Sequence, residues 1–220
     1  MLKKSIITAM ILCFLFTLCS CTKKEVNTED AIDFLKNIES YTCFVEIKIS
    51  NDKQNIIYKG REIYDKRYGY RFEINNERVL LYIGDKIYVK DLTNNSEYVT
   101  DKDFDSLYRL SFMGEYIGLL YTDEEIKSTL SKIGGEQFQI IKLTIPGINR
   151  NLNTAELYIN ISSNLPQKLI IYDVDKKKKV EITYKGFMVN PQIEEEQFSI
   201  SFLHKEDTDD ALKNECMMVT

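Results

Sequence analysis

Apolar and polar residues alternate with a period of two along most of the chain, which is the pattern of half-buried β-strands. In residues 41–49, for example, each apolar side chain is followed by a mostly polar neighbour. Strands are predicted at 41–49, 56–64, 68–74, 79–83, 86–91 and 97–100, and again at 138–145, 154–161, 167–173, 179–187 and 198–202. The chain is therefore expected to be mainly β.

Short polar segments between these strands contain the residues of tight turns. Residues 75–77 (Asn-Asn-Glu) and 84–85 (Gly-Asp) tolerate the positive φ that hairpin turns need. Residues 164–166 separate two later strands, and the lysine-rich 175–178 is interpreted as a solvated hairpin tip rather than a membrane-binding patch. Strands joined by such turns pair antiparallel, so a meander is expected. Three aromatic residues are expected on one face of the 68–74 strand: Tyr68, Tyr70 and Phe72.

Three segments depart from this period and are predicted to be helical. Residues 28–40 place apolar residues at helical spacing, with Thr28 as the N-cap. Residues 104–121 are too crowded with apolar groups for a solvated loop, which favours a mostly buried helical insert. A Thr-x-x-Glu capping box opens a helix at 122–133, and the glycines at 134–135 close it as a left-handed C-cap.

The predicted fold is mainly β (α+β): an unclosed antiparallel β-barrel, or half-barrel, of about ten strands. The N-terminal helix precedes it, and the helical insert covers its mouth. If the insert lines the mouth, its side chains can hold an acyl chain or offer a groove to a partner; the alternative is that it fills the interior. The candidate cavity or partner-binding residues are Phe104, Leu107, Tyr108, Phe112, Met113, Tyr116 and Ile117.

The first residues of the chain have the features of an export signal. Lys3 and Lys4 precede an apolar run at 6–18, which is shorter than the roughly 20 residues of a spanning helix. The run ends in Leu-Cys-Ser-Cys at 18–21, which resembles the lipobox of bacterial lipoproteins. That resemblance implies cleavage before Cys21 and its modification by a diacylglycerol and an acyl chain such as palmitate. The alternative is an uncleaved anchor or an ordinary signal.

A lipidated Cys21 implies an exported protein that is anchored to the outer face of a membrane, either the cell membrane or a spore membrane. Residues 1–20 are then the signal peptide and residues 21–27 a tether. Residues 28–202 form the folded domain, and residues 203–220 form a polar C-terminal tail.

Net charge argues against a nucleic-acid partner. The formal charge of −5 at pH 7 becomes −7 when Lys3 and Lys4 leave with the signal, and an acidic surface repels phosphates. Of the five cysteines, only Cys43 and Cys216 remain unassigned once the signal is removed and Cys21 is lipidated. Whether these two pair stays open; an unpaired Cys43 in the core is the preferred interpretation, because it lies in an apolar strand face.

The sequence lacks motifs for catalysis or metal binding. The single histidine, His204, lies in the polar tail and is interpreted as a surface residue. No nucleophile elbow, phosphate loop or metal-spaced cysteine pair is present, so neither a metal nor a cofactor beyond the lipid on Cys21 is expected. Two carboxylates can hydrolyse a glycosidic bond without histidine, but charge runs are usually solvated. The acidic candidates are Asp101, Asp103, Asp105, Glu194, Glu195 and Glu196.

The order of these features is similar to that of the LolA/LolB-type fold of lipoprotein carriers and related envelope proteins. The stretches that carry the resemblance lie at 66–74, 79–91, 97–99 and 184–200. Together with the lipobox, they resemble the germination lipoproteins of spore-forming clostridia (GerS type). The resemblance implies a non-enzymatic protein that binds and supports a cortex-modifying N-acetylmuramoyl-L-alanine amidase, which is needed for germination. The alternative is a lipid or lipoprotein carrier or sensor that uses the barrel cavity.

An unclosed sheet also leaves strand edges that can accept a strand from a second chain. The polar tail and the strand near Phe198 are the candidate edges. Two copies exchanging a strand would form a homodimer.

Overall fold

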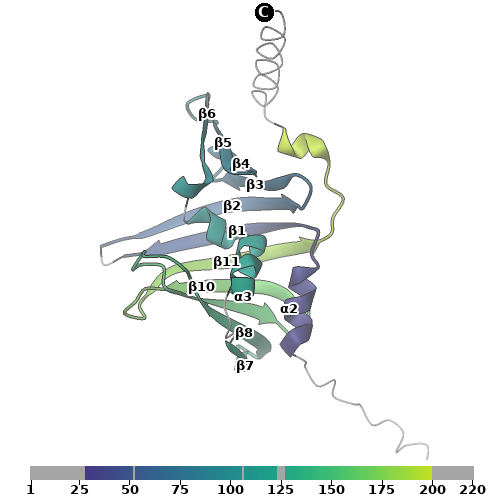
Figure 1. The fold of residues 1–220 in the computed structure, drawn as a ribbon, viewed down its shortest axis with the longest axis vertical. Helices are drawn as coiled ribbons and strands as arrows, with labels where there is room; N and C mark the ends of the chain where they lie inside the picture. The colour runs from purple at the N-terminus through teal and green to yellow at the C-terminus, as the bar shows by residue number, and fades with distance from the viewer. Residues whose placement is uncertain (1–27, 52, 106, 123–126, 200–220) are drawn as a thin grey trace, which may run out of the picture.

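The computed structural model describes residues 28–51, 53–105, 107–122 and 127–199, which contain one antiparallel sheet of eleven strands (Figure 1). The first six strands are β1 (Ser40–Ser50), β2 (Asn55–Asp65), β3 (Gly69–Ile74), β4 (Arg78–Ile83), β5 (Lys86–Asp91) and β6 (Ser96–Asp101). The other five are β7 (Lys127–Ile133), β8 (Glu136–Thr144), β9 (Thr154–Asn160), β10 (Leu165–Tyr172) and β11 (Lys178–Val189). The mainly β architecture is confirmed.

The sheet consists of two meanders joined at their long strands. Its order is β6-β5-β4-β3-β2-β1-β11-β10-β9-β8-β7, so β1 pairs with β2 on one side and with β11 on the other. Strands β6 and β7 lie at the two ends and do not pair with each other. The expected unclosed antiparallel sheet is therefore confirmed, with its edges at β6 and β7.

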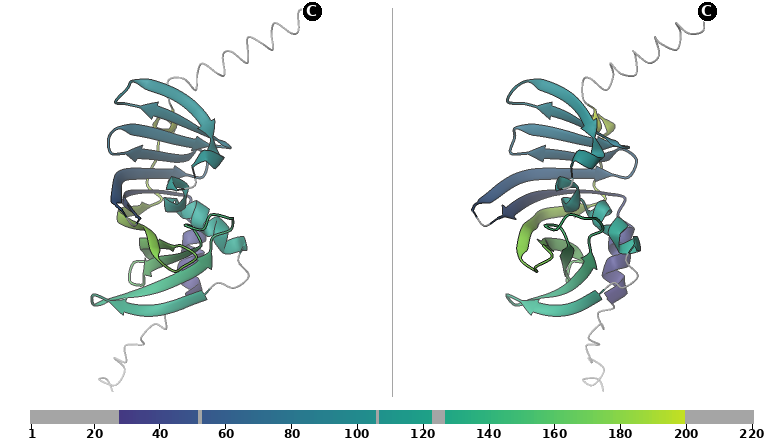
Figure 2. Two further views of the ribbon diagram at one scale, coloured as in Figure 1. Left: turned by 90° about the vertical axis from the view of Figure 1, so that its left-hand side faces the viewer. Right: turned by 60° about the vertical axis from the view of Figure 1, so that its left-hand side comes forward.

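The helical segments lie mainly on the inner face of the curved sheet (Figure 2). They are α2 (Thr28–Lys36), η1 (Lys102–Phe104), η2 (Tyr108–Ser111), α3 (Met113–Thr122) and η3 (Glu195–Phe198). Residues 102–122 form the insert, which crosses the inner face between β6 and β7. The main core lies between this face, α2 and the insert. Within the described residues, no helix is long and apolar enough to span a membrane.

A smaller cluster lies on the outer face of the sheet. Ile63 of β2 and Leu81 of β4 pack there against Ile193 and Phe198 of the segment after β11. Residues 190–198, which we call the strap, thus cover the outer face of β2 to β4. The Arg71 guanidinium donates to the Gln197 carbonyl at 2.8 Å and ties the strap to β3.

The predicted turns are present. Asn75 and Asn76, with φ of 51° and 58°, join β3 to β4, and Gly84, with φ of 56°, joins β4 to β5. The lysine-rich segment is the β10–β11 hairpin tip, where the Asp173 carboxylate accepts backbone N–H groups from Asp175 and Lys177. Here a few residues with special backbone preferences decided the structure locally.

The helix predicted at 122–133 is wrong: 127–133 is the edge strand β7. Its backbone pairs with β8 along its whole length, from Lys127 opposite Lys142 to Ile133 opposite Glu136. Gly134 and Gly135 have positive φ, as a C-cap requires, but they form the β7–β8 turn. Because β7 buries little of its side chains, hydrogen bonding to a sheet edge decided its conformation, and the capping pattern could not reveal that.

Two further expectations fail for local reasons. Tyr68 precedes β3, and Gly69, with φ of 100°, turns the chain so that Tyr68 packs against Phe198, with ring centroids 5.5 Å apart. Tyr68 therefore does not share the inner face of β3 with Tyr70 and Phe72. Phe198 belongs to η3 rather than to a strand, and residues 200–202 lie outside the described residues. Phe198 is therefore not a sheet edge.

Substitution of two glycines of α3 can show how closely the insert packs against the sheet. A methyl group on Gly114 would overlap the Tyr70 hydroxyl, whereas nothing lies within 4 Å of the corresponding position at Gly118. We expect Gly114→Ala to lower the free energy of unfolding by about 1–3 kcal/mol. Gly118→Ala should raise it by up to about 1 kcal/mol, because alanine is the better helix former. Urea denaturation of the full chain measures both, and equal effects would contradict this seating.

Candidate functional site

A buried carboxyl group lies under the insert. Glu62 of β2 faces inward and is only 1% exposed. Its Oε1 contacts the Ser111 hydroxyl of η2, and its Oε2 lies 3.3 Å from the Tyr41 hydroxyl and 3.7 Å from the Cys43 thiol of β1. These contacts join β1 and β2, which lie near the middle of the sheet, to the insert.

The hydrogen bonds around this carboxyl group favour its neutral form. The Ser111 hydroxyl has one proton, which it donates to the Tyr108 carbonyl at 2.7 Å. The short contact between Ser111 and Glu62 Oε1 then needs a proton from the carboxyl group, while Oε2 accepts from Tyr41 and Cys43. Burial raises the pKa of Glu62 to about 8, although the hydrogen bonds that it accepts from Tyr41 and Cys43 oppose the rise. Burial also raises the pKa of Tyr41 and of Cys43, so both remain donors.

Other strands hold the insert through buried tyrosines. The Tyr41 hydroxyl accepts the Met113 backbone N–H at 3.1 Å, at the start of α3. Tyr184 of β11 donates to the Ser111 carbonyl at 2.8 Å, and Tyr116 of α3 donates to the Ile141 carbonyl of β8 at 3.1 Å. Because these bonds reach both meanders, the insert links the two halves of the sheet.

Aromatic packing supports the same arrangement. Phe112, between η2 and α3, is fully buried against three rings of β3 and β4. Its ring stacks on Tyr70 with centroids 4.4 Å apart, and it meets Tyr82 at 4.9 Å and Phe72 at 6.0 Å, edge to face in both cases. The insert therefore fills the inside of this part of the sheet.

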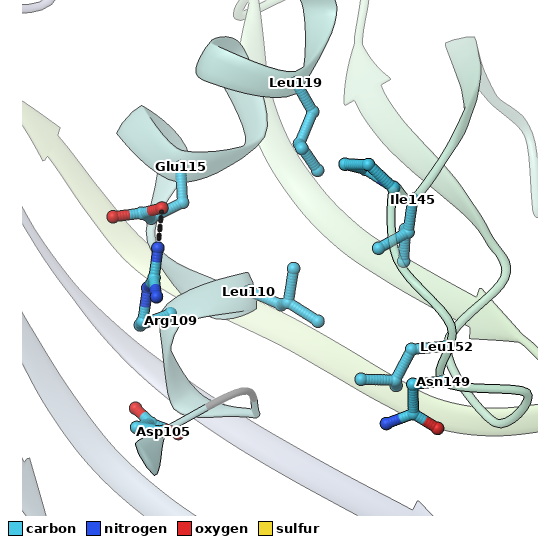
Figure 3. Close-up of a pocket in the computed structure, with 9 residues that line it drawn as sticks. Asp105, Arg109, Leu110, Glu115, Leu119, Ile145, Asn149 and Leu152 are labelled. Atoms are coloured by element: carbon cyan, nitrogen blue, oxygen red, sulfur yellow. Dashed lines mark hydrogen bonds and ion pairs between the residues drawn. The ribbon is translucent and has the colours of Figure 1, made fainter. Parts of the chain in front are cut away.

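A cavity of about 260 Å³ lies beside the insert (Figure 3). Leu110 of η2 and Leu119 of α3 face Ile145 and Leu152 of the β8–β9 connection across it. At the end formed by the insert, the Arg109 guanidinium pairs with Glu115 at 3.0 Å. The remaining lining residues are Asp105, Pro146 and Asn149.

The structure distributes the seven insert candidates over three environments. Phe112, Met113 and Tyr116 are core residues. Leu107, Tyr108 and Ile117 are partly buried against that core, and Phe104 is 80% exposed. None of the seven lines the cavity of Figure 3, whose insert side comes from Leu110 and Leu119 instead. The lipidation candidate Cys21 lies outside the described residues.

The acidic candidates do not come together as a catalytic pair. Asp101 pairs with Lys86 at 2.5 Å, and the Asp105 carboxylate accepts the backbone N–H groups of Leu107 and Tyr108 at 2.9 Å. The other four candidates are exposed: Asp103, Glu194, Glu195 and Glu196. In the described part of the chain, no three metal-ligating side chains gather into a possible metal site.

Of the remaining cysteine and histidine predictions, the structure tests only the one for Cys43. Cys43 is a free thiol buried in the core, as preferred. Cys216 and His204 lie outside the described residues.

Sequence reasoning missed Glu62, although a signal was present. In a strand with a period of two, Glu62 shares a face with Tyr58 and Tyr64. An isolated acid among tyrosines on a strand face is a candidate for a buried, hydrogen-bonded carboxyl group. Its partner Ser111 is 49 residues away, so only the folded structure could identify it.

Comparison with protein families gives one match over most of the chain. The family described as "Sporulation protein YdcC-like" matches residues 2–198. Comparison with curated proteins gives no match.

Solved structures include several similar chains. An uncharacterized conserved protein from Thermus thermophilus has 9% identity and a TM-score of 0.52, covering 79% of this chain and 91% of its own. The complex of the CwlD amidase from Clostridioides difficile with the GerS lipoprotein contains a chain with 26% identity and a TM-score of 0.45, covering 77% and 96%. The LolA superfamily protein NE2245 from Nitrosomonas europaea has 13% identity and a TM-score of 0.42, covering 80% and 99%. The likeness to the Thermus thermophilus protein shows that the two chains share a fold.

The Glu62 network predicts a specific pH dependence of stability. In the unfolded chain this carboxyl group titrates near 4.5, and in the folded chain at about 8. Between these values the folded state holds the extra proton, so stability falls as pH rises and stays low above pH 8. At about 1.4 kcal/mol per pKa unit, the loss is on the order of 5 kcal/mol. Glu62→Gln, which mimics the neutral acid, should remove most of this slope between pH 5 and 8.5 in urea denaturation.

Glu115→Gln is the matched control. Burial alone would raise the pKa of Glu115, but hydrogen bonds from Lys102 and Arg109 lower it. This carboxyl group is therefore ionised in both the folded and the unfolded state throughout that pH range. The control should lower the free energy of unfolding by a similar amount at pH 5 and at pH 8.5, so that stability depends on pH as it does in the wild type. An unchanged slope in Glu62→Gln would contradict a neutral Glu62.

Proposed function

Because this chain belongs to the family of YdcC-like sporulation proteins, we propose that it is a non-enzymatic lipoprotein that binds and supports a cortex-modifying N-acetylmuramoyl-L-alanine amidase. Through that amidase it serves modification of the spore cortex and hence germination. The family match over residues 2–198 is the observation that carries the proposal. The partner supplies the chemistry.

The site geometry favours a binding role over catalysis. Glu62 has the raised pKa of a general acid, but it is enclosed under the insert and is used to hold it. The other acidic candidates are exposed or are engaged in ion pairs and backbone contacts. A binding function needs only a rigid scaffold with an accessible surface, which this sheet offers on its outer face.

The class of partner follows from the sequence resemblance to germination lipoproteins. In Clostridioides difficile, the GerS lipoprotein forms a complex with the CwlD amidase. We assign this chain a partner of the same enzymatic class. A strand-exchanged homodimer remains part of the proposal, with the edge strands β6 and β7 as the available edges.

The membrane anchor completes the proposal. Cys21 would carry a diacylglycerol and an acyl chain such as palmitate, with residues 21–27 as the tether to the domain at α2. This anchor holds the protein at the outer face of the cell membrane or a spore membrane. No other cofactor is required.

The carrier alternative has one feature in its favour, the partly apolar cavity of Figure 3. At about 260 Å³ it is smaller than the roughly 300–1,000 Å³ of ligand pockets, and the insert occupies the space beneath the sheet. We therefore expect solvent extraction of the purified full chain to release no stoichiometric lipid, because the lipid on Cys21 is covalently attached and stays with the protein. One mole of extractable acyl lipid per mole of protein, measured by mass spectrometry, would favour the carrier instead.

The amidase partnership is tested by affinity purification from sporulating cells. The tagged full chain should recover an N-acetylmuramoyl-L-alanine amidase from the membrane fraction. A Cys21→Ala form exported through an ordinary signal should recover the same amidase from the soluble fraction, because the anchor sets location rather than binding. Recovery of lipoproteins without an amidase would contradict the proposal.

A further inference from the structure

The outer face of the central strands carries two exposed apolar side chains. Phe44 of β1 is 60% exposed and Met188 of β11 is 56% exposed. Phe44 extends over Gly186, a glycine of β11 with φ of 60°, and would lie 3.7 Å from a methyl group there. Both residues lie within strands rather than at turn tips.

Two cations flank Phe44 directly. Arg61 of β2 and Lys185 of β11 are its cross-strand partners, so all three share the outer face. Of the six arginines in the chain, four form ion pairs: Arg67, Arg71, Arg78 and Arg109. Arg61 and Lys185 form no ion pair with any described residue.

The surroundings add positive charge in a chain whose net charge is −5. Lys48, Lys59 and Lys168 lie on the same face, as the strand register shows. The acids there are Glu46, opposite Lys59, Glu73, which lies opposite Arg61 and pairs with Arg71 at 2.8 Å, and Glu181, which pairs with Lys178 at 2.5 Å. This part of the outer face is therefore basic, and it complements an acidic surface.

Phe44 and Met188 extend the apolar surface that the strap covers on the neighbouring strands. Met188 and Ile63 are the two cross-strand partners of Thr42, and Ile63 is already buried by the strap. Beyond Thr42, the strap leaves Met188 and Phe44 uncovered. The apolar strip thus runs from beneath the strap into an open area flanked by cations.

We propose that this outer-face patch (Phe44, Arg61, Lys185 and Met188) is the docking surface for the amidase, and the inference rests on the proposed function. The partner contributes an acidic segment whose carboxylates meet Arg61 and Lys185 and whose apolar side chain packs on Phe44 and Met188. A central aromatic residue with an arginine beside it is typical of a residue cluster that dominates binding energy. A protein partner fits better than a lipid surface, because mid-strand side chains on a sheet face cannot reach far into a bilayer.

The test compares amidase affinity among variants of the full chain in detergent micelles. We expect the double variant Arg61→Glu/Lys185→Glu to raise the Kd for the purified amidase at least tenfold. Phe44→Ser should do the same, with circular dichroism showing that its sheet is retained. The matched control is Arg150→Glu, the other arginine without an ion pair among the described residues. It lies in the β8–β9 connection, and its Kd should stay within twofold of wild type.

The results distinguish failure of the amidase partnership from failure of the docking surface. Wild-type chain that does not bind the amidase would overturn the proposed function and this surface with it. Wild-type affinity in Arg61→Glu/Lys185→Glu would overturn the surface alone. The Cys21→Ala form can also be sedimented with phosphatidylglycerol vesicles. If the charge reversals abolish that sedimentation and leave amidase affinity unchanged, the patch is a membrane contact instead.

Discussion

The neutral carboxyl group of Glu62 is the constraint on which the rest of the structure depends. An ionised carboxylate at this depth, without a cation beside it, would be costly, whereas a protonated one fits every donor and acceptor around it. It joins β1 and β2 to the insert, and the insert in turn reaches β8 and β11 through Tyr116 and Tyr184. An unclosed sheet has few contacts between its two ends, so the insert replaces the strand pairing that closure would supply.

In this arrangement the insert fills the inner face of the sheet, whereas much of the outer face remains exposed. Phe112 and its aromatic neighbours fill the inner face near β3 and β4, and the residual cavity beside the insert is small. On the outer face, the strap covers only β2 to β4. The central strands therefore present their outer side chains to whatever the protein meets, and these are basic and apolar in an otherwise acidic chain. A scaffold of this kind suits an accessory protein held beside an enzyme.

Much of this fold could be predicted from the sequence because local physics decided it. Alternation specified the strand from Ser40 to Ser50, and Asn75, Asn76 and Gly84 specified their turns. The errors arose where distant contacts decided. Lys127–Ile133 became a strand because β8 offers it an edge, and Phe104 is exposed although Phe112 and Met113 of the same insert are core residues. Glu62 and Ser111, and likewise Arg61 and Lys185 around Phe44, are brought together only by strand register and the insert.

The most direct test of this account is site-specific photo-crosslinking in sporulating cells. A photoreactive amino acid at position 44 reports on the outer face, and one at position 119 reports on the cavity beside the insert. The account predicts a crosslink to an N-acetylmuramoyl-L-alanine amidase from position 44 and none from position 119, with the crosslinked protein identified by mass spectrometry. An amidase crosslink from position 119 alone, or from neither position, would contradict it.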